Sequence, residues 1–175
     1  KEIIDALIKS TNHITIPGSL LEIINILNNL LLSDPAVVLN DMQIKIIRRL
    51  MEIITYQGKQ ESTIQLTIVD ILNKLLPIDY THELTGIHID IISKLIESTN
   101  YIEAKWSLLD IINIFDKLLP SDPAVGLNDI QIKIIYQLIK TTKYTTTTPD
   151  IHNKIMSILG NILNIFLSPN AILNH

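Results

Sequence analysis

Apolar residues recur along the chain three or four positions apart, which is the spacing of one face of an α-helix. In one segment they are Ile44, Ile47, Leu50, Met51 and Ile54. Other segments, such as 108–119, carry two adjacent apolar stripes, which is typical of a helix buried against more than one neighbour. No segment alternates strictly with period two, and Asn-Gly and Asp-Gly hairpin turns are absent. The pattern therefore predicts an all-α protein.

Turn and capping residues separate these apolar segments. Ser19 follows Pro17-Gly18 and is predicted to cap the second helix, while Asn40 and Asn128 are predicted to cap the third and seventh. Pro149 suits the first turn of the last helix. We predict eight helices, at 2–11, 20–32, 41–55, 63–76, 86–98, 104–119, 129–142 and 150–167.

The chain contains an internal duplication. Residues 1–56 align without a gap on residues 89–144, at an offset of 88, with 32 identities in 56 positions. Within each half the apolar pattern repeats again, beginning at Ile3, Ile46, Ile91 and Ile134, so the spacings are 43, 45 and 43 residues. Four two-helix units follow, with 1–88 as the first duplicated half and 89–175 as the second.

A two-helix unit of this length resembles the repeats of HEAT and armadillo-like proteins, which stack into solenoids. Eight helices of ordinary length also suffice for a closed bundle. The sequence therefore predicts four tandem two-helix units forming either a short solenoid or a compact bundle. Because the units are copies, their apolar residues should form one core that continues from unit to unit.

Part of the chain has a further resemblance. The segment 84–96, which begins Leu-Thr-Gly-Ile-His, and the segment 108–119 with its Pro-containing linker resemble the helical subdomain of GAIN domains, which occur in adhesion-type receptors and polycystin-like proteins. Autoproteolysis in that family uses a Cys-bearing portion and a His-Leu-Thr or His-Leu-Ser tripeptide. This chain has no Cys, and His82-Glu83-Leu84-Thr85 departs from the tripeptide, so no catalytic residue carries over. The resemblance implies an extracellular stalk or scaffold.

Composition and charge exclude several classes of function. The 175 residues include 37 Ile and 25 Leu, enough for a sizeable core, and the net charge of −4 argues against general nucleic-acid binding. Without Cys, disulfides, thiolate zinc sites and thiol nucleophiles are excluded. The chain starts at Lys1 rather than Met, so we expect a processed chain and favour an extracellular over a cytoplasmic location. The longest stretch without charge, 155–174, contains too many polar residues for a membrane span.

Residues that could perform catalysis do not form a recognisable site. The histidines have no metal-ligand spacing, so we predict that they face solvent or cap helices: His13, His82, His88, His152 and His175. Asp34-Pro35 and its duplicate Asp122-Pro123 suit turns and caps better than an acid–base pair. No glycine-rich phosphate loop is present. We therefore predict a protein that is not an enzyme, with no catalytic, cofactor or metal residues.

For several other features we prefer an explanation that involves no specific function. Lys45, Arg48 and Arg49 are interpreted as a solvated face, and Trp106 as packed in the core or against a helix start. The segment Thr145–Thr148 is interpreted as a linker, with O-glycan acceptance as the alternative. Asn recurs inside the second helix of each unit, as a buried polar ladder or, preferably, as codon bias: Asn25, Asn73, Asn113, Asn161 and Asn164.

Taken together, these patterns predict a non-enzymatic helical-repeat protein. It would act as a protein-interaction, scaffold or structural assembly module, bound to a protein partner or to copies of itself. The alternative is a carrier of an apolar ligand or lipid, held in a cavity between helix pairs lined by bulky Ile and Leu side chains.

Overall fold

A computed structural model of the chain describes residues 2–31, 40–55, 61–77, 79–102, 104–122 and 126–167. These residues form eight helices and no strand, which confirms the all-α prediction, and no predicted helix boundary is wrong by more than three residues. The helices are α1 Glu2–Ser10, α2 Pro17–Asn29, α3 Asp41–Ile54, α4 Ser62–Lys74, α5 Gly86–Ser98, α6 Lys105–Leu118, α7 Asp129–Thr142 and α8 Pro149–Leu167.

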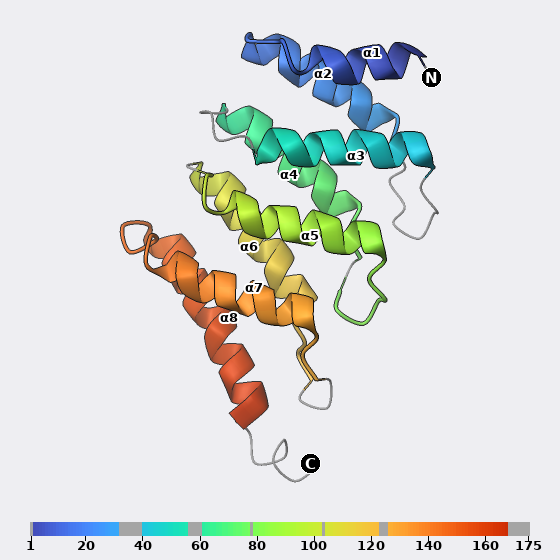
Figure 1. Cartoon of the computed structure of the whole chain (residues 1–175). Helices are drawn as coiled ribbons and strands as arrows, with labels where there is room; N and C mark the ends of the chain where they lie inside the picture. The colour runs from blue at the N-terminus through green and yellow to red at the C-terminus, as the bar shows by residue number, and fades with distance from the viewer. Residues whose placement is uncertain are drawn as a thin grey trace.

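The helices are arranged in two layers of a short solenoid (Figure 1). The odd-numbered helices lie side by side in one layer, where α3 packs on α5 and α5 on α7. The even-numbered helices form the other layer, where α2 packs on α4, α4 on α6 and α6 on α8. The pair α1–α2 stands at one end of the stack and α7–α8 at the other. Of the two architectures that the sequence left open, the structure shows the open stack.

The apolar residues form one core that runs along the whole stack. Leu27, Leu72, Phe115 and Ile155, one from each even-numbered helix, are all essentially buried and belong to a single cluster. Ile47 joins them from the odd layer. The broad apolar stripes of the even helices are explained, because these helices contact both the odd layer and their even neighbours.

Side-chain caps fix where several helices begin. Asn40 and Asn128 each form a capping box with a glutamine three residues later, as the sequence predicts for these two asparagines. The prediction for Ser19 is wrong, because α2 already begins at Pro17, with Ile16 in the cap position. Proline is well suited to the first helical position, where its missing N–H would have no partner.

The frame of the duplication does not coincide with the helix pairs. The second half of the sequence repeat starts at residue 89, inside α5. The predicted turn residues Asp34, Pro35 and Pro123 lie outside the described residues. No helix in the described ranges is long and apolar enough to cross a membrane, in agreement with the expectation for the uncharged stretch 155–174, of which 155–167 is described.

Candidate functional site: a groove between α5 and α7

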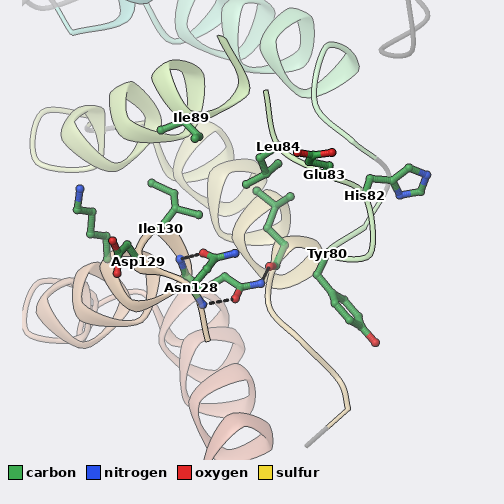
Figure 2. Close-up of a pocket in the computed structure, with 11 residues that line it drawn as sticks. Tyr80, His82, Glu83, Leu84, Ile89, Asn128, Asp129 and Ile130 are labelled. Atoms are coloured by element: carbon green, nitrogen blue, oxygen red, sulfur yellow. Dashed lines mark hydrogen bonds between the residues drawn. The ribbon is translucent and has the colours of Figure 1, made fainter. Parts of the chain in front are cut away.

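A hollow of about 570 Å³ opens where α7 begins (Figure 2). One wall is the segment between α4 and α5, which contributes Tyr80, Glu83 and Leu84. Across from it lie Ile89 on α5 and Ile130 in the first turn of α7, so apolar side chains line the middle of the hollow. The charged groups stand at its rim and the hydrocarbon groups at its centre, an arrangement that suits a partner with an apolar anchor.

The capping box of α7 fixes the floor of this hollow. The Asn128 side chain accepts a hydrogen bond from the Gln131 backbone N–H, and the Gln131 side-chain oxygen accepts one from the Asn128 N–H, both at 3.0 Å (Figure 2). The Gln131 amide nitrogen also donates to the Leu118 carbonyl, at 2.9 Å. Gln131 therefore connects the start of α7 to the end of α6. Both the oxygen and the nitrogen of its buried side-chain amide are hydrogen-bonded.

A second hollow, of about 410 Å³, continues along the two helices. It lies between Ser93 and Ile96 on α5 and Ile132 and Tyr136 on α7, and it shares Lys133 with the first hollow. Tyr136 is 70% exposed, although it is large and aromatic. We call the continuous surface formed by Ile89, Ile96, Ile132, Lys133 and Tyr136 the α5–α7 groove. Large apolar side chains gathered on an exposed surface are typical of an interaction site.

In the first half, the equivalent surface between α1 and α3 is occupied by charged side chains that form ion pairs and a hydrogen bond. Lys45 on α3 forms an ion pair with Asp5 on α1. Arg49 donates to Thr11, the residue that follows α1, at 2.6 Å and pairs with Glu52 at 2.8 Å. The cationic cluster predicted as a solvated face is thus partly engaged in holding α1 and α3 together, while its third member, Arg48, is exposed.

The duplication has diverged at these contacts. At an offset of 88, Lys45 corresponds to Lys133, but Asp5 corresponds to Ser93 and the exposed Arg48 to Tyr136. Lys133 is exposed and has no ion-pair partner in the described part of the chain. Among the described residues, the second half therefore carries an unpaired lysine and an aromatic side chain where the first half carries an ion pair and an arginine.

The structure places the histidines separately. His88 completes the capping box of α5, where its Nδ1 accepts a hydrogen bond from the Thr85 backbone N–H at 3.2 Å, and burial lowers its pKa. His82 is exposed and pairs with Asp79 at 3.0 Å. His13 is exposed, His152 is half-buried in the first turn of α8, and His175 lies outside the described residues. His88 as a cap and His13 and His82 as exposed side chains agree with the prediction.

Acidic groups with a perturbed pKa lie outside the groove. Two hydrogen bonds from Thr81 and one from His82 lower the pKa of the exposed Asp79 carboxyl. Burial, together with the charge of Asp70, raises the pKa of Asp110 in the even layer. Within the described ranges, no group of three or more His, Asp or Glu side chains could hold a metal ion.

Two interpretations of the sequence need correction, and one alternative is excluded. Trp106 is not packed: it is 65% exposed in the first turn of α6, where the first half has Gly18, and the Lys105 ammonium lies 5.4 Å from its ring centre. Thr145 is buried and hydrogen-bonded to the end of α7, so 145–148 is a structured turn rather than a simple linker. None of the repeated asparagines is buried, so they form no buried ladder.

A third hollow, of about 570 Å³, lies at the opposite ends of α5 and α7. Several of its polar groups already have partners: Gln137 donates to Thr99 at 2.6 Å, and Lys140 to Asn100 at 2.9 Å. The first two hollows are lined mainly by α5, α7 and the segments that precede them, whereas the third also includes Lys105 and Leu108 of α6 and Ile151 of α8. Storage of an apolar ligand between the layers stays a prediction.

Comparison of the chain with models of known protein families and with curated proteins finds no match. The resemblances to GAIN domains and to HEAT and armadillo-like repeats therefore stay predictions beyond the helical-repeat architecture itself.

Proposed function

We propose that the chain is a non-enzymatic helical-repeat module that binds a protein partner in the α5–α7 groove. The observation that supports this proposal is a difference between the two halves: the second half lacks the acid of the ion pair between α1 and α3 and has an exposed tyrosine in place of an arginine. Where Asp5 and Arg48 stand in the first half, Ser93 and Tyr136 stand in the second. Tyrosine is enriched among the residues that dominate binding energy at protein interfaces.

The chemistry of the groove specifies the partner. Its length along two neighbouring helices and its apolar side chains, Ile89, Ile132 and Tyr136, suit the apolar face of an amphipathic helix. Lys133 has no acidic partner in the described part of the chain, unlike Lys45, and so favours a carboxylate beside that face. We infer an amphipathic helical segment with an apolar stripe flanked by Asp or Glu.

The proposal is tested by selecting binders from a displayed library of helical peptides, with the full chain as target. We expect selected peptides to share an apolar stripe and an adjacent acid. Tyr136→Arg should raise their dissociation constant at least ~10-fold, because it removes a central aromatic contact. Ser93→Asp should also weaken binding, since it offers Lys133 a partner within the chain, as Asp5 does for Lys45.

The matched control is Arg48→Gln, which changes the equivalent exposed position of the first half and should leave binding unchanged. Selected peptides that bind the Tyr136→Arg variant as tightly as the wild type would refute the α5–α7 groove as the binding site. Circular dichroism of each variant checks that the helices remain, and all three positions are exposed, so we expect no loss of fold.

A further inference from the structure

The last unit of the stack exposes side chains at its outer end. Ile139 on α7 and Met156 and Leu163 on α8 are between 50 and 58% exposed. We call these three residues the C-terminal end surface. In a solenoid the end units lack one neighbour, and end units that function as caps usually carry polar outer faces. This end is apolar instead.

The copies of these residues in the first half are buried. Ile139 corresponds to Met51 at the offset of 88. Helices α4 and α8 align at an offset of 87, which matches the buried Ile64 and Ile68 to the buried Ile151 and Ile155. At that offset Met156 and Leu163 correspond to two further buried residues. The copies are at most 5% exposed: Met51, Val69 and Leu76.

The first unit shows the reverse relationship. Ile3 on α1, Ile26 on α2 and Leu30, just after α2, are between 41 and 77% exposed. We call them the N-terminal end surface. Their copies, 88 residues later, are at most 3% exposed: Ile91, Ile114 and Leu118. The difference identifies the side chains that the preceding helix pair covers in the middle of the stack.

Both sets of buried copies belong to one internal junction, where α3 packs on α5 and α4 packs on α6. Met51, Val69 and Leu76 come from the first side of that junction, and Ile91, Ile114 and Leu118 from the second. The C-terminal end surface is thus a copy of one side, and the N-terminal end surface is a copy of the other. We propose that a second copy of the chain docks head to tail, so that the two end surfaces repeat this junction.

Polar residues at the junction predict a weaker contact than the internal one. Lys117 on α6 donates to Asn73 on α4 at 3.0 Å, but the copies of these residues are Asn29 and Gly160, which cannot form the same bond. In compensation, the facing carboxylates Asp70 and Asp110 are replaced by Ser157 and Glu22, so the repulsion is absent. The contact depends mainly on apolar burial and should be reversible.

The geometry of this contact fixes the kind of assembly. Different surfaces of the two copies meet, so the interface is heterologous and leaves one end surface of each type free on every dimer. Further copies can then add at either end, so the assembly extends along the axis of the stack that Figure 1 shows for one chain. The α5–α7 groove lies along the side of the stack, so this inference is independent of the proposed partner binding.

Sedimentation velocity over a dilution series tests the proposal. The wild-type chain should show concentration-dependent dimers and longer oligomers. Leu163→Lys blocks the C-terminal end surface and Ile26→Lys the N-terminal one, and each should raise the dissociation constant at least ~30-fold. An equimolar mixture of the two variants should form a 1:1 dimer that does not grow, because each variant retains the surface that the other lacks.

Trp106→Lys is the matched control, since it adds the same charge at an exposed position on α6, inside the stack and outside the α5–α7 groove, and should assemble like the wild type. A wild-type chain that stays monomeric at high concentration overturns the proposal. So does a Leu163→Lys variant that dimerises by itself, because that result indicates a symmetric interface elsewhere. A mixture of the two blocked variants that contains only monomers overturns it as well.

Discussion

The imidazole Nδ1 of His88 accepts a hydrogen bond from the Thr85 backbone N–H at 3.2 Å, and this contact takes the place of a glutamine side chain. In α3 and α7 the same position of the capping box is Gln43 and Gln131. Unlike glutamine, histidine loses its acceptor when it is protonated. Of the three capping boxes in the described residues, the one at α5 is therefore weakened when His88 is protonated at acidic pH.

Burial lowers the pKa of His88 below the value of the unfolded chain, about 6.5. The folded state then binds fewer protons than the unfolded state, so the free energy of unfolding decreases as the pH falls through this range. We expect His88→Gln to be as stable as the wild type at about pH 7.5 and more stable at about pH 5. Urea unfolding followed by circular dichroism at both pH values measures this difference.

Two further variants distinguish the contribution of the capping box to stability from the effect of protonating its histidine. Thr85→Ala removes the other half of the box and should destabilise the chain by about 1 kcal/mol at both pH values. Gln131→His should introduce a pH dependence of the same sign at α7. If His88→Gln and the wild type lose stability equally on acidification, the pH effect comes from another group.

Gln131 also holds α7 against α6, through its bond to the Leu118 carbonyl. Gln131→Glu keeps an oxygen for the Asn128 N–H but places a carboxylate oxygen against that carbonyl. We expect it to lower the free energy of unfolding by ~1–3 kcal/mol, since a buried acceptor loses its donor and a charge is buried. Gln131→Ala loses the cap but adds no charge, and should cost less. A Glu variant as stable as the wild type would contradict the buried bond.

Asp110 on α6 is destabilising where it stands. Its raised pKa, caused by burial and by Asp70, means that the folded state binds more protons than the unfolded state at mildly acidic pH. Stability therefore falls as the pH rises through the range above the unfolded pKa, about 3.9. Asp110→Asn should stabilise the chain by a few tenths of a kcal/mol at neutral pH, because solvent screens the partly exposed carboxyl. Thermal melts at neutral pH and at about pH 3 test this.

The stabilisation by Asp110→Asn should disappear at the lower pH, where the wild-type Asp110 carboxyl is protonated. Asp70→Asn is the comparison: it removes the same repulsion but also breaks the ion pair with Lys74, which is 2.7 Å long. We therefore expect a smaller gain from it. Equal stability of Asp110→Asn and the wild type at both pH values would argue against the burial of this group.

Helix positions and caps were predictable because they depend on residues close in sequence. The spacing of Ile44, Ile47 and Leu50 defines a helical face, and Asn40 and Asn128 are strong caps in almost any context. The prediction for Ser19 is wrong because Pro17 competes for the start of the same helix. The solenoid was one of two alternatives, since the contacts that distinguish a stack from a bundle are between helices far apart in sequence.

The α5–α7 groove was not predictable as a site. The sequence shows that Arg48 is replaced by Tyr136, and Asp5 by Ser93, but it does not show that these positions face one another across two helices. A residue-by-residue comparison of the two halves could have found the divergence. Trp106 was misplaced for a related reason: an aromatic residue at a helix start packs only if a neighbour covers it, and here it is 65% exposed.

The position of a residue along the stack should decide the cost of truncating it. Leu72 is fully buried in α4, and its replacement by Ala should cost ~2–5 kcal/mol, the range for a large side chain removed from a core. Leu163 has the same chemistry but lies at the end of the stack, so Leu163→Ala should change the monomer by less than ~0.5 kcal/mol. Unfolding at low protein concentration, where end-to-end docking is absent, makes the comparison. At high concentration Leu163→Ala should become measurably less stable than the wild type, because only the wild type then gains free energy from a docked neighbour.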